Sequence, residues 1–153
     1  MEKIKGFICD IDGTVANHDG IRGHHEYDKV SLDTPHQHVI DVVRLLAADL
    51  QPVFLSGRPE RARKDTHNWI IKYIDPFGDF FDIRYHLFMR PDFLPDGKPD
   101  YRQDYVVKEE IYHNKIEPYD DIQFAIDDRP QVLKLWHRLG IPTLAVGTPW
   151  INF

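Results

Sequence analysis

Two acidic residues follow the first apolar run of the chain, in the stretch Cys9-Asp10-Ile11-Asp12-Gly13-Thr14. The run itself, Ile4 to Cys9, is typical of a buried strand, so the acids stand where that strand ends. Because open α/β proteins bind ligands at the carboxyl edge of a parallel sheet, Asp10 and Asp12 are candidate functional residues. Their oxygens suit a hard cation such as Mg²⁺ together with a phosphate. A calcium-type loop or a plain acidic turn is the alternative interpretation.

Further polar groups occur where later elements are expected to begin or end. Ser56-Gly57-Arg58 follows the apolar run 52–55, and its hydroxyl and backbone N–H groups could hold phosphate oxygens. Asp127-Asp128 follows the run 124–126, and two adjacent carboxylates repel each other unless a cation neutralises them. Lys108 is expected near a helix start, where the helix dipole disfavours it, so it needs another partner. Ser56-Gly57-Arg58 could instead be a polar turn, and Lys108 could be a solvated surface lysine. The order and spacing of all these groups along the chain, taken together, argue against those interpretations.

The spacing of apolar residues predicts strands that alternate with helices, which is the pattern of a parallel sheet with right-handed crossovers. Asp33, Pro35, Pro59 and Pro130 mark expected helix starts, and Gly140 marks the end of the last helix. The expected strands span residues 4–9, 52–55, 83–89, 122–126 and 142–146, and the expected helices lie near 35–47, 59–74, 102–114 and 130–139.

Composition limits the class of protein. The 153 residues are expected to form one domain, 1–153, with a substantial core. A net charge of −6 is unlike that of a protein that coats nucleic acid, but a few arginines suffice to bind one phosphorylated end. The lone cysteine, Cys9, excludes an internal disulfide and is expected in the core. No stretch resembles a signal peptide or reaches the length of a membrane span, so a cytoplasmic protein without membrane contact is expected.

The order of the polar groups resembles the motifs of the haloacid dehalogenase (HAD) phosphohydrolases. The resemblance implies an α/β fold, a HAD-like Rossmannoid three-layer sandwich with a five-stranded, mainly parallel sheet. The intervals between the motifs leave room for a minimal cap or none. Asp10 would be the nucleophile that forms an aspartyl-phosphate, and Asp12 the acid and then the base. Ser56 and Gly57 would hold the phosphate, Lys108 would neutralise it, and the implied Mg²⁺ ligands are Asp10, the backbone carbonyl of Asp12, Asp127 and Asp128, with Asp128 favoured over Asp127 as the direct ligand.

The resemblance extends over nearly the whole chain to the 3′-phosphatase domain of the phage-type polynucleotide kinase-phosphatases. Its most specific part is Asp127-Asp128-Arg129-Pro130-Gln131-Val132, and residues 104–111 and Tyr27-Asp28 fit the same domain. The resemblance implies Mg²⁺-dependent removal of 3′-phosphate, and of 2′,3′-cyclic phosphate, from RNA or DNA ends. It also implies arginines that bind the substrate phosphate bidentately. The candidates are Arg22, Arg58 and Arg90. Arg129 is a candidate for a structural salt bridge.

The chain departs from that pattern in two places. It contains no Gly-x-x-x-x-Gly-Lys-Ser/Thr phosphate loop, so no 5′-kinase activity is expected, and a kinase or ligase partner would be a separate chain. In the first loop the register is shifted by about one residue, and Pro35 stands where an acidic residue is expected. The assignment of Arg22 and the choice between RNA and DNA both depend on this loop.

Two other functions stay open at the level of sequence. A small-molecule HAD phosphatase acting on nucleotides or sugar phosphates would carry the same motifs. A non-enzymatic module that binds phosphorylated ends is disfavoured because it has no use for the acid–base residue Asp12. His18, His24 and His25 cluster in one loop without zinc-type spacing and are expected at its surface. Trp150 is a weaker candidate for stacking on a base.

Overall fold

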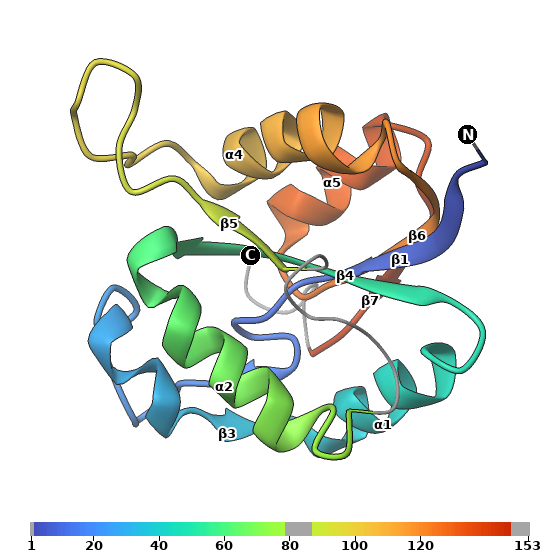
Figure 1. Cartoon of the computed structure of the whole chain (residues 1–153). Coiled ribbons are helices and arrows are strands. Elements are labelled where there is room, and N and C mark those ends of the chain that lie inside the picture. Colours follow the sequence, from blue (N-terminus) through green and yellow to red (C-terminus); the bar gives the residue numbers. More distant parts are fainter. Residues whose placement is uncertain (1, 79–86, 148–153) are drawn as a thin grey trace.

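The computed structural model describes residues 2–78 and 87–147, and it is built around a sheet of five parallel strands (Figure 1). The strands lie in the order β5-β4-β1-β6-β7, and every pairing between them is parallel. The α/β fold expected from the alternating pattern is therefore confirmed. The strands span Ile4–Cys9 (β1), Gln51–Pro59 (β4), Leu87–Arg90 (β5), Asp120–Asp127 (β6) and Thr143–Ala145 (β7).

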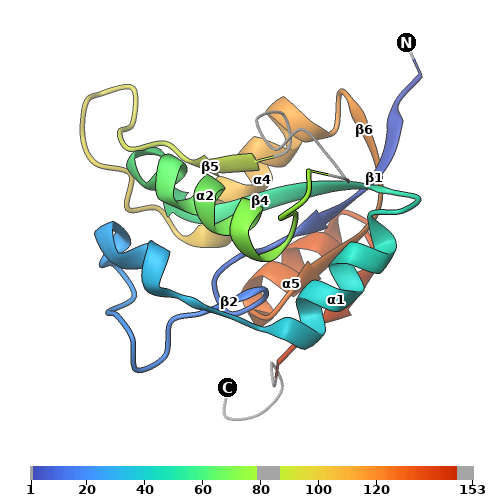
Figure 2. The same cartoon turned by 60° about the horizontal axis from the view of Figure 1, so that its bottom comes forward.

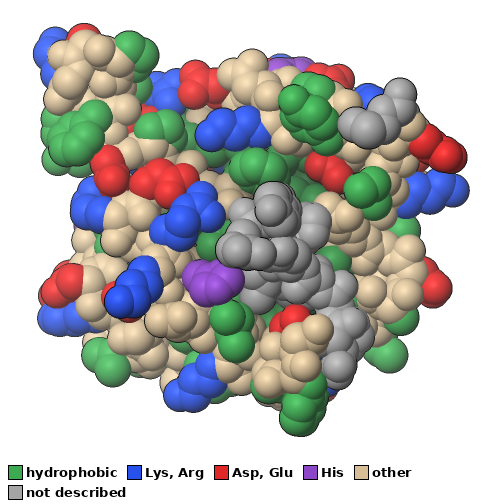
Figure 3. All heavy atoms as spheres, viewed as in Figure 1, with side chains coloured by type: hydrophobic (Ala, Val, Ile, Leu, Met, Phe, Trp, Pro, Cys, Tyr) green, Lys and Arg blue, Asp and Glu red, His purple; other side chains and the backbone are tan. Residues whose placement is uncertain are grey.

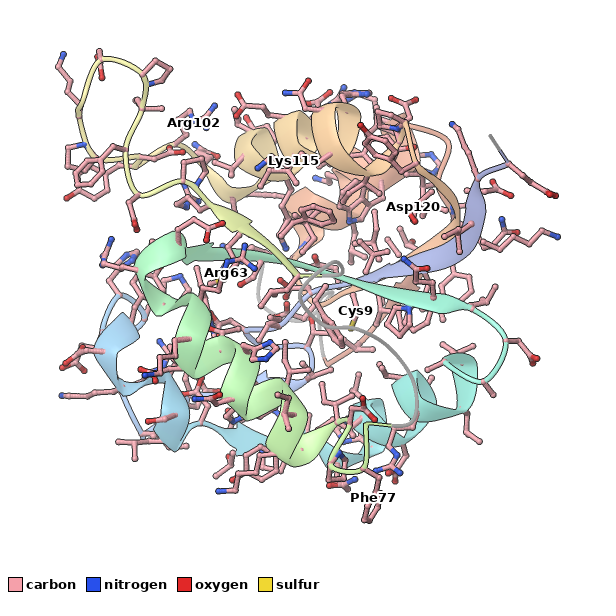
Figure 4. The ribbon with its side chains drawn as sticks, viewed as in Figure 1. Cys9, Arg63, Phe77, Arg102, Lys115 and Asp120 are labelled. Atoms are coloured by element: carbon pink, nitrogen blue, oxygen red, sulfur yellow. The ribbon has the colours of Figure 1, made fainter. Side chains whose placement is uncertain are left out.

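Among the residues that the structure describes, four helices cover the two faces of the sheet: Gln37–Leu46 (α1), Arg63–Tyr73 (α2), Asp104–Ile111 (α4) and Pro130–Arg138 (α5). Alternate side chains of β1 point to opposite faces, as the pleat of a strand requires. Phe7 and Cys9 pack into a core with α1 and α2, whereas Ile8 packs into a second core with α4 and α5. Figure 1 shows the two helix pairs on either side of the sheet. The expected three-layer sandwich is confirmed, and the structure places Cys9 in the core (Figure 4).

The strand order reverses between β1 and β6. From β1 the chain moves outward to β4 and β5, and it then returns to β6 on the other side and continues to β7. A crevice forms at the carboxyl ends of the strands at such a reversal, and ligands of open α/β sheets bind there. Asp10 directly follows β1, and Asp127 is the last residue of β6. The fold therefore brings the two acidic motifs to the position where a ligand site is expected.

A small unit between β1 and α1 stands in the place of a cap. It consists of β2 (Ala16–Asn17) paired antiparallel with β3 (Thr34–Pro35), and of the 3₁₀ helix η1 (Tyr27–Leu32), which packs against α2. Figure 2 shows this segment leaving the sheet at β2 and returning toward α1. In the described residues no larger unit is inserted, in agreement with the expected minimal cap.

The first helix begins later than predicted. Asp33 and Pro35 were expected to cap and open it, but Pro35 lies in β3 and the residue that precedes the helix is His36. The reason is that the Asp33 carboxylate accepts hydrogen bonds from Arg22 and Arg58 instead of from backbone N–H groups of the helix. A tertiary ion pair has overridden the local capping signal.

Other predicted elements differ at their boundaries or are described only in part. Pro59 ends β4 instead of opening a helix, and the short 3₁₀ turn η2 (Glu60–Ala62) precedes α2. The helix predicted over 102–114 is α4 followed by the π-helical turn η3 (Tyr112–Ile116). The predicted strand 83–89 is β5 where it is described, while residues 83–86 and Trp150 lie outside the described residues. No helix in the described ranges is both long enough and apolar enough to cross a bilayer.

Candidate active site

Three carboxylates and a lysine meet at the reversal between β1 and β6. One oxygen each of Asp10, Asp127 and Asp128 lies within 4.8 Å of the others. Lys108 Nζ donates hydrogen bonds to Asp10 Oδ1 (2.7 Å) and to Asp127 Oδ2 (3.0 Å). The lysine was predicted near a helix start, but it lies in the last turn of α4, where the helix dipole favours a cation. Its side chain is 1% exposed, so these ion pairs are what hold it in the site.

The charges of this cluster do not balance. Burial raises the pKa of both Asp127 and Asp128, and the neighbouring Asp10 carboxylate raises both further. Burial alone would lower the pKa of Lys108, but the charges of Asp10, Asp104 and Asp127 raise it, so the ammonium stays protonated. Repulsion among carboxylates that a single lysine cannot neutralise is the condition that a divalent cation relieves. The donor set is all oxygen, which fits Mg²⁺.

The tight turn after β1 orients two of these carboxylates. The backbone N–H groups of residues 14–16 all donate to the Ile11 carbonyl. Thr14 Oγ1 donates to Asp10 Oδ2 (2.9 Å) and also lies 3.3 Å from Asp128 Oδ1. Gly13 has φ +82°, and a side chain there would collide with the Asp128 carboxylate. The Gly-Thr pair of the sequence motif is therefore explained by backbone conformation and by a hydroxyl that links two acids.

Asp12 points to a different set of partners. Arg58 Nη2 donates to Asp12 Oδ1 at 2.6 Å, and Arg22 Nη2 donates to the same oxygen at 2.9 Å. Burial would raise the pKa of Asp12, but the two guanidinium groups, Arg58 first, hold that pKa below its ordinary value. Asp12 is therefore a carboxylate in this structure, and its side chain does not belong to the three-acid cluster.

Asp33 is a buried acid that joins the two arginines. It accepts hydrogen bonds from Arg22 Nε (2.7 Å) and Nη2 (2.8 Å) and from Arg58 Nη2 (2.8 Å). An acid was expected at position 35, but the acid that meets the two arginines is Asp33, which was predicted only as a helix cap. Arg22 and Arg58 were the signal that could have found it, because buried guanidinium groups need buried carboxylates.

Arg22 has no donor left for a substrate. Its Nε and Nη2 bind Asp33, Nη2 also binds Asp12, and Nη1 donates to the backbone carbonyls of the next two residues. A guanidinium carries five N–H groups, and these contacts engage all of them. Arg58 is fully buried and also donates to Thr66 Oγ1 (3.0 Å). Both residues lie against Asp12, and the structure does not place either among the residues that line the cavity above Asp10.

That cavity has a volume of about 160 Å³ and two other arginines at its wall. Arg90 is fixed by hydrogen bonds from Nε to the Gly57 carbonyl (2.9 Å) and from Nη1 to the Arg102 carbonyl (2.6 Å). Arg129 is 40% exposed and pairs with Asp104 at 3.9 Å. The lining residues are Asp10, Asp12, His24, His25, Tyr27, Gly57, Arg90, Asp104 and Arg129.

Asp104 and Ser56 support this wall. Asp104 lies 3.4 Å from Lys108 Nζ and 3.5 Å from Arg90 Nη2, and a side chain at Gly57 would collide with it. Asp104 lies in the stretch 104–111 that resembles the family, but its motif predicts no role for it. Ser56 is buried at the site, and its Oγ accepts a hydrogen bond from the Arg58 backbone N–H at 3.1 Å.

A family model of protein domains matches residues 4–149 of the chain, and its description is the polynucleotide kinase PNKP phosphatase domain. The chain belongs to this family. As a PNKP-type phosphatase domain with a HAD-type fold, it is a phosphatase, in agreement with the resemblance of its motifs.

Relatives of this PNKP-type domain include a putative bifunctional polynucleotide kinase/RNA ligase of Autographa californica nuclear polyhedrosis virus. It is 37% identical over 144 residues, which are 92% of this chain and 19% of that protein. The solved structure of a Pnkp1/Rnl/Hen1 complex has a chain that is 30% identical, with a TM-score of 0.80, and the match covers 95% of this chain and 47% of that one. A second structure, of the Pnkp1/Rnl/Hen1 RNA repair complex, gives 28% identity, a TM-score of 0.80 and coverage of 95% and 44%.

A class C acid phosphatase from Bacillus anthracis, solved with tungstate bound, has the same fold. Its TM-score is 0.62 at 14% identity, and the match covers 97% of this chain and 68% of that one. The PNKP-type domain thus spans 19% of the curated relative and under half of each Pnkp1 chain.

Proposed function

We propose that this domain removes phosphate from the 3′ end of a polynucleotide, with Mg²⁺ at Asp10, Asp127 and Asp128. One observation carries the proposal: Lys108 Nζ binds Asp10 Oδ1 at 2.7 Å, beside two further carboxylates, under a cavity that opens to solvent. A nucleophile, a charge-neutralising lysine and an oxygen-rich cation site are the parts that phosphoryl transfer needs. The cation, when bound, neutralises charge on the transferred phosphoryl group.

In the first step the Asp10 carboxylate attacks phosphorus, and the bond from phosphorus to the 3′ oxygen breaks. The leaving oxygen takes a proton from Asp12, and Asp10 becomes an aspartyl-phosphate. Asp12 must first be protonated, because Arg58 and Arg22 hold its pKa low in the substrate-free domain. A phosphate dianion beside Asp12 offsets those positive charges and raises the affinity of the carboxylate for a proton.

In the second step water attacks the phosphorus of the aspartyl-phosphate. Asp12, ionised after the first step, takes a proton from that water, and inorganic phosphate and the Asp10 carboxylate are released. The low pKa of Asp12 suits it to remain ionised until water arrives. The same residue therefore serves in turn as acid and as base.

The arginines divide into two groups with different roles. We assign Arg90 and Arg129 to the substrate phosphate because both line the cavity. Arg90 offers its Nη2, since Nε and Nη1 are held by the Gly57 and Arg102 carbonyls, whereas the half-exposed Arg129 can bind phosphate bidentately. Arg22 and Arg58 are assigned instead as positioning residues for Asp12, since their donors are committed to Asp12 and Asp33. This revises the role in substrate binding that the family resemblance implied for them.

We propose RNA as the polynucleotide. The names of the relatives point to RNA ligation and RNA repair, and the same names suggest a ligase as a partner in the cell. A 3′-phosphate leaves no free 3′ hydroxyl for strand joining, so its removal prepares an end for a ligase. A terminal 2′,3′-cyclic phosphate is a further substrate to test.

The test is phosphate release from matched RNA and DNA oligonucleotides that carry phosphate at the 3′ or the 5′ end, with a 2′,3′-cyclic RNA end as a further arm. Selective Mg²⁺-dependent release from the RNA 3′ end is expected. Equal release from both ends, or release only from nucleotides and sugar phosphates, would assign the domain to small-molecule substrates instead.

A further inference from the structure

A second hollow continues from the candidate active site. It has a volume of about 660 Å³, within the range of pockets that hold nucleoside-sized ligands, and it shares His25, Tyr27 and Arg90 with the cavity above Asp10. Its remaining lining comes from the segment after β4 and the loop 91–101 after β5. We call this hollow the aromatic groove. Because the two hollows share these lining residues, they adjoin, and a group attached to a phosphate at Asp10 lies next to the aromatic groove.

The walls of the aromatic groove carry large rings, of which Phe93 and Tyr101 belong to neither core. Phe93 is 62% exposed and Tyr101 is 88% exposed, and Tyr27 at the shared rim is half-buried. Arg61 lies over the Tyr27 ring, with its guanidinium carbon 5.7 Å from the ring centre. Figure 3 shows hydrophobic and basic side chains together on the lobe at the upper left that this loop forms. Exposed rings beside a catalytic cavity are typical of a surface that binds a ligand.

The loop that presents Phe93 and Tyr101 is fixed in place. Phe93 pairs with Pro99 as an antiparallel bridge, and the Leu94 N–H donates to the Lys98 carbonyl at 2.8 Å. At its base the buried Asp100 accepts hydrogen bonds from Arg102 Nε (3.0 Å) and Nη2 (2.8 Å). Arg90 joins the base of the loop to the active-site wall. The backbone that carries the two rings is therefore fixed before a ligand arrives, which lowers the entropy cost of binding.

The other hollow beside the site lacks these features. It has a volume of about 410 Å³ next to Asp128, and the described residues that line it include no Phe, Tyr or Trp. The aromatic groove has mixed charge, because Asp92 lies 3.4 Å from Arg61 and Asp100 pairs with Arg102. Stacking on rings, more than attraction to phosphates, is the interaction that the aromatic groove offers.

We propose that the aromatic groove binds the bases that precede the terminal phosphate of a single-stranded 3′ end, which stack on Phe93 and Tyr101. The inference rests on the proposed function and extends it from a phosphorylated end to an unpaired strand of at least two or three nucleotides. Aromatic side chains accept every base because each base has a π-face, so no sequence preference is expected. Arg61 lies where it can approach a phosphate of the strand.

The test compares substrates of increasing length. Values of kcat/KM are measured for a ribonucleoside 3′-phosphate and for 3′-phosphorylated RNA of two, three and six nucleotides. The wild-type ratio of trinucleotide to mononucleotide is expected to be large. Phe93→Ala and Tyr101→Ala should each lower that ratio by about tenfold, since one base–ring stack is worth on the order of a factor of ten.

Three controls separate stacking from other effects. Tyr101→Phe keeps the ring and should keep the ratio. Phe77→Ala removes an equally exposed ring (76%), which Figure 4 shows at the opposite end of the molecule from Arg102, and it should also keep the ratio. Replacing the penultimate base with an abasic site should reproduce the loss in the wild type and should add little in the ring variant, Phe93→Ala or Tyr101→Ala, whose ring stacks on that base.

The outcomes also separate this inference from the proposed function. If the wild type releases no phosphate from any RNA 3′ end, the proposed function fails and the inference fails with it. If RNA of every length is hydrolysed but the ratio is unchanged in Phe93→Ala and Tyr101→Ala, the function stands and the inference is overturned. A duplex with a flush 3′ end that is cleaved as fast as a single strand would overturn it as well.

Discussion

At the scale of single residues, the site consists of two charge clusters that meet at the turn after β1. Asp10 belongs to the cluster with Lys108 and Asp127, whereas Asp12 belongs to the cluster with the two buried arginines. Two neighbouring acids thus have opposite surroundings. Asp10 stands among carboxylates where a cation is favoured, as suits the proposed nucleophile, and Asp12 stands among cations that keep it ionised in the substrate-free domain, as suits the proposed base.

The buried acid Asp33 is predicted to matter for both stability and catalysis. Asp33→Asn leaves the charges of Arg22 and Arg58 without their shared partner, and removing one member of a buried ion pair costs about 3–5 kcal/mol. Urea unfolding measures that loss. Asp41→Asn, at an exposed acid of α1, is the matched control and should change stability by less than about 0.5 kcal/mol. An Asp33→Asn protein as stable as the wild type would contradict the role assigned to this acid.

Sequence patterns predicted the cluster around Asp10 better than the cluster around Asp12. The structure brings Asp10, Lys108 and Asp127 together, as expected, because each follows from its place at a strand end or in a helix of a parallel sheet. Arg22 was assigned to substrate because no pattern in the sequence shows which acid a buried arginine will meet. Asp33 was assigned to a helix cap for the same reason: local signals do not reveal a tertiary partner.

At the scale of elements, the turn between β1 and β2 positions the site by its backbone. Gly13→Ala is predicted to impair catalysis, because a methyl group at φ +82° is strained and also collides with Asp128. Gly20→Ala has a similar φ of +70° with nothing near the added methyl group, so it isolates the backbone strain. Both variants should lose about 1–2 kcal/mol of stability.

Only Gly13→Ala should lower kcat, by at least about tenfold, since a displacement of a catalytic group by about 1 Å costs up to a hundredfold. Steady-state kinetics on a 3′-phosphorylated RNA, together with urea unfolding of both variants, checks this pair. Equal kcat values in the two variants would mean that the contact between position 13 and Asp128 has no part in the reaction.

The order of the elements was predictable, but several boundaries were not. Alternating apolar runs predicted every described strand of the central sheet and the four helices that cover it. Pro35 and Pro59 failed as helix starts because each lies in a strand, in β3 and at the end of β4. The pairing of Pro35 with Ala16 is a contact between distant residues, which local propensity cannot anticipate.

At the scale of the whole molecule, stability should depend on the cation and on pH. Asp127 and Asp128 have pKa values of about 7 and about 8 in the folded protein, above the ordinary value of 3.8. At a pH between 3.8 and the folded pKa values, the unfolded chain therefore binds fewer protons than the folded protein. The stability that the two acids contribute is complete below 3.8 and is lost as the pH rises through the folded pKa values.

Thermal unfolding in chelator and in Mg²⁺ measures this dependence. Without a cation, Tm is expected to fall by several degrees between about pH 5 and about pH 9. Mg²⁺ should raise Tm, and the increase should be larger at the higher pH. Asp128→Asn should flatten the fall and weaken the response to Mg²⁺. If Mg²⁺ left the wild-type Tm unchanged at every pH, that result would argue against a cation at this cluster.

The charge of the whole chain also bears on how it meets its substrate. A net charge of −6 offers no general attraction to a polyanion, and binding must come from the arginines at the cavity and the rings of the aromatic groove. Few phosphates are then contacted, so the affinity should change little with salt. This favours a domain that meets strand ends over one that binds along a strand.

The most direct test of the account is to ask whether substrate phosphate becomes attached to Asp10. RNA carrying a radiolabelled 3′-phosphate is mixed with excess protein and Mg²⁺, the reaction is stopped in acid, and label on the protein and in free phosphate is followed over time. Label should appear on the peptide that contains Asp10. It should form more slowly but persist in Asp12→Asn, which lacks both the acid of the first step and the base of the second, and it should be absent in Asp10→Asn, which should release no phosphate. Release by Asp10→Asn at the wild-type rate would contradict the account.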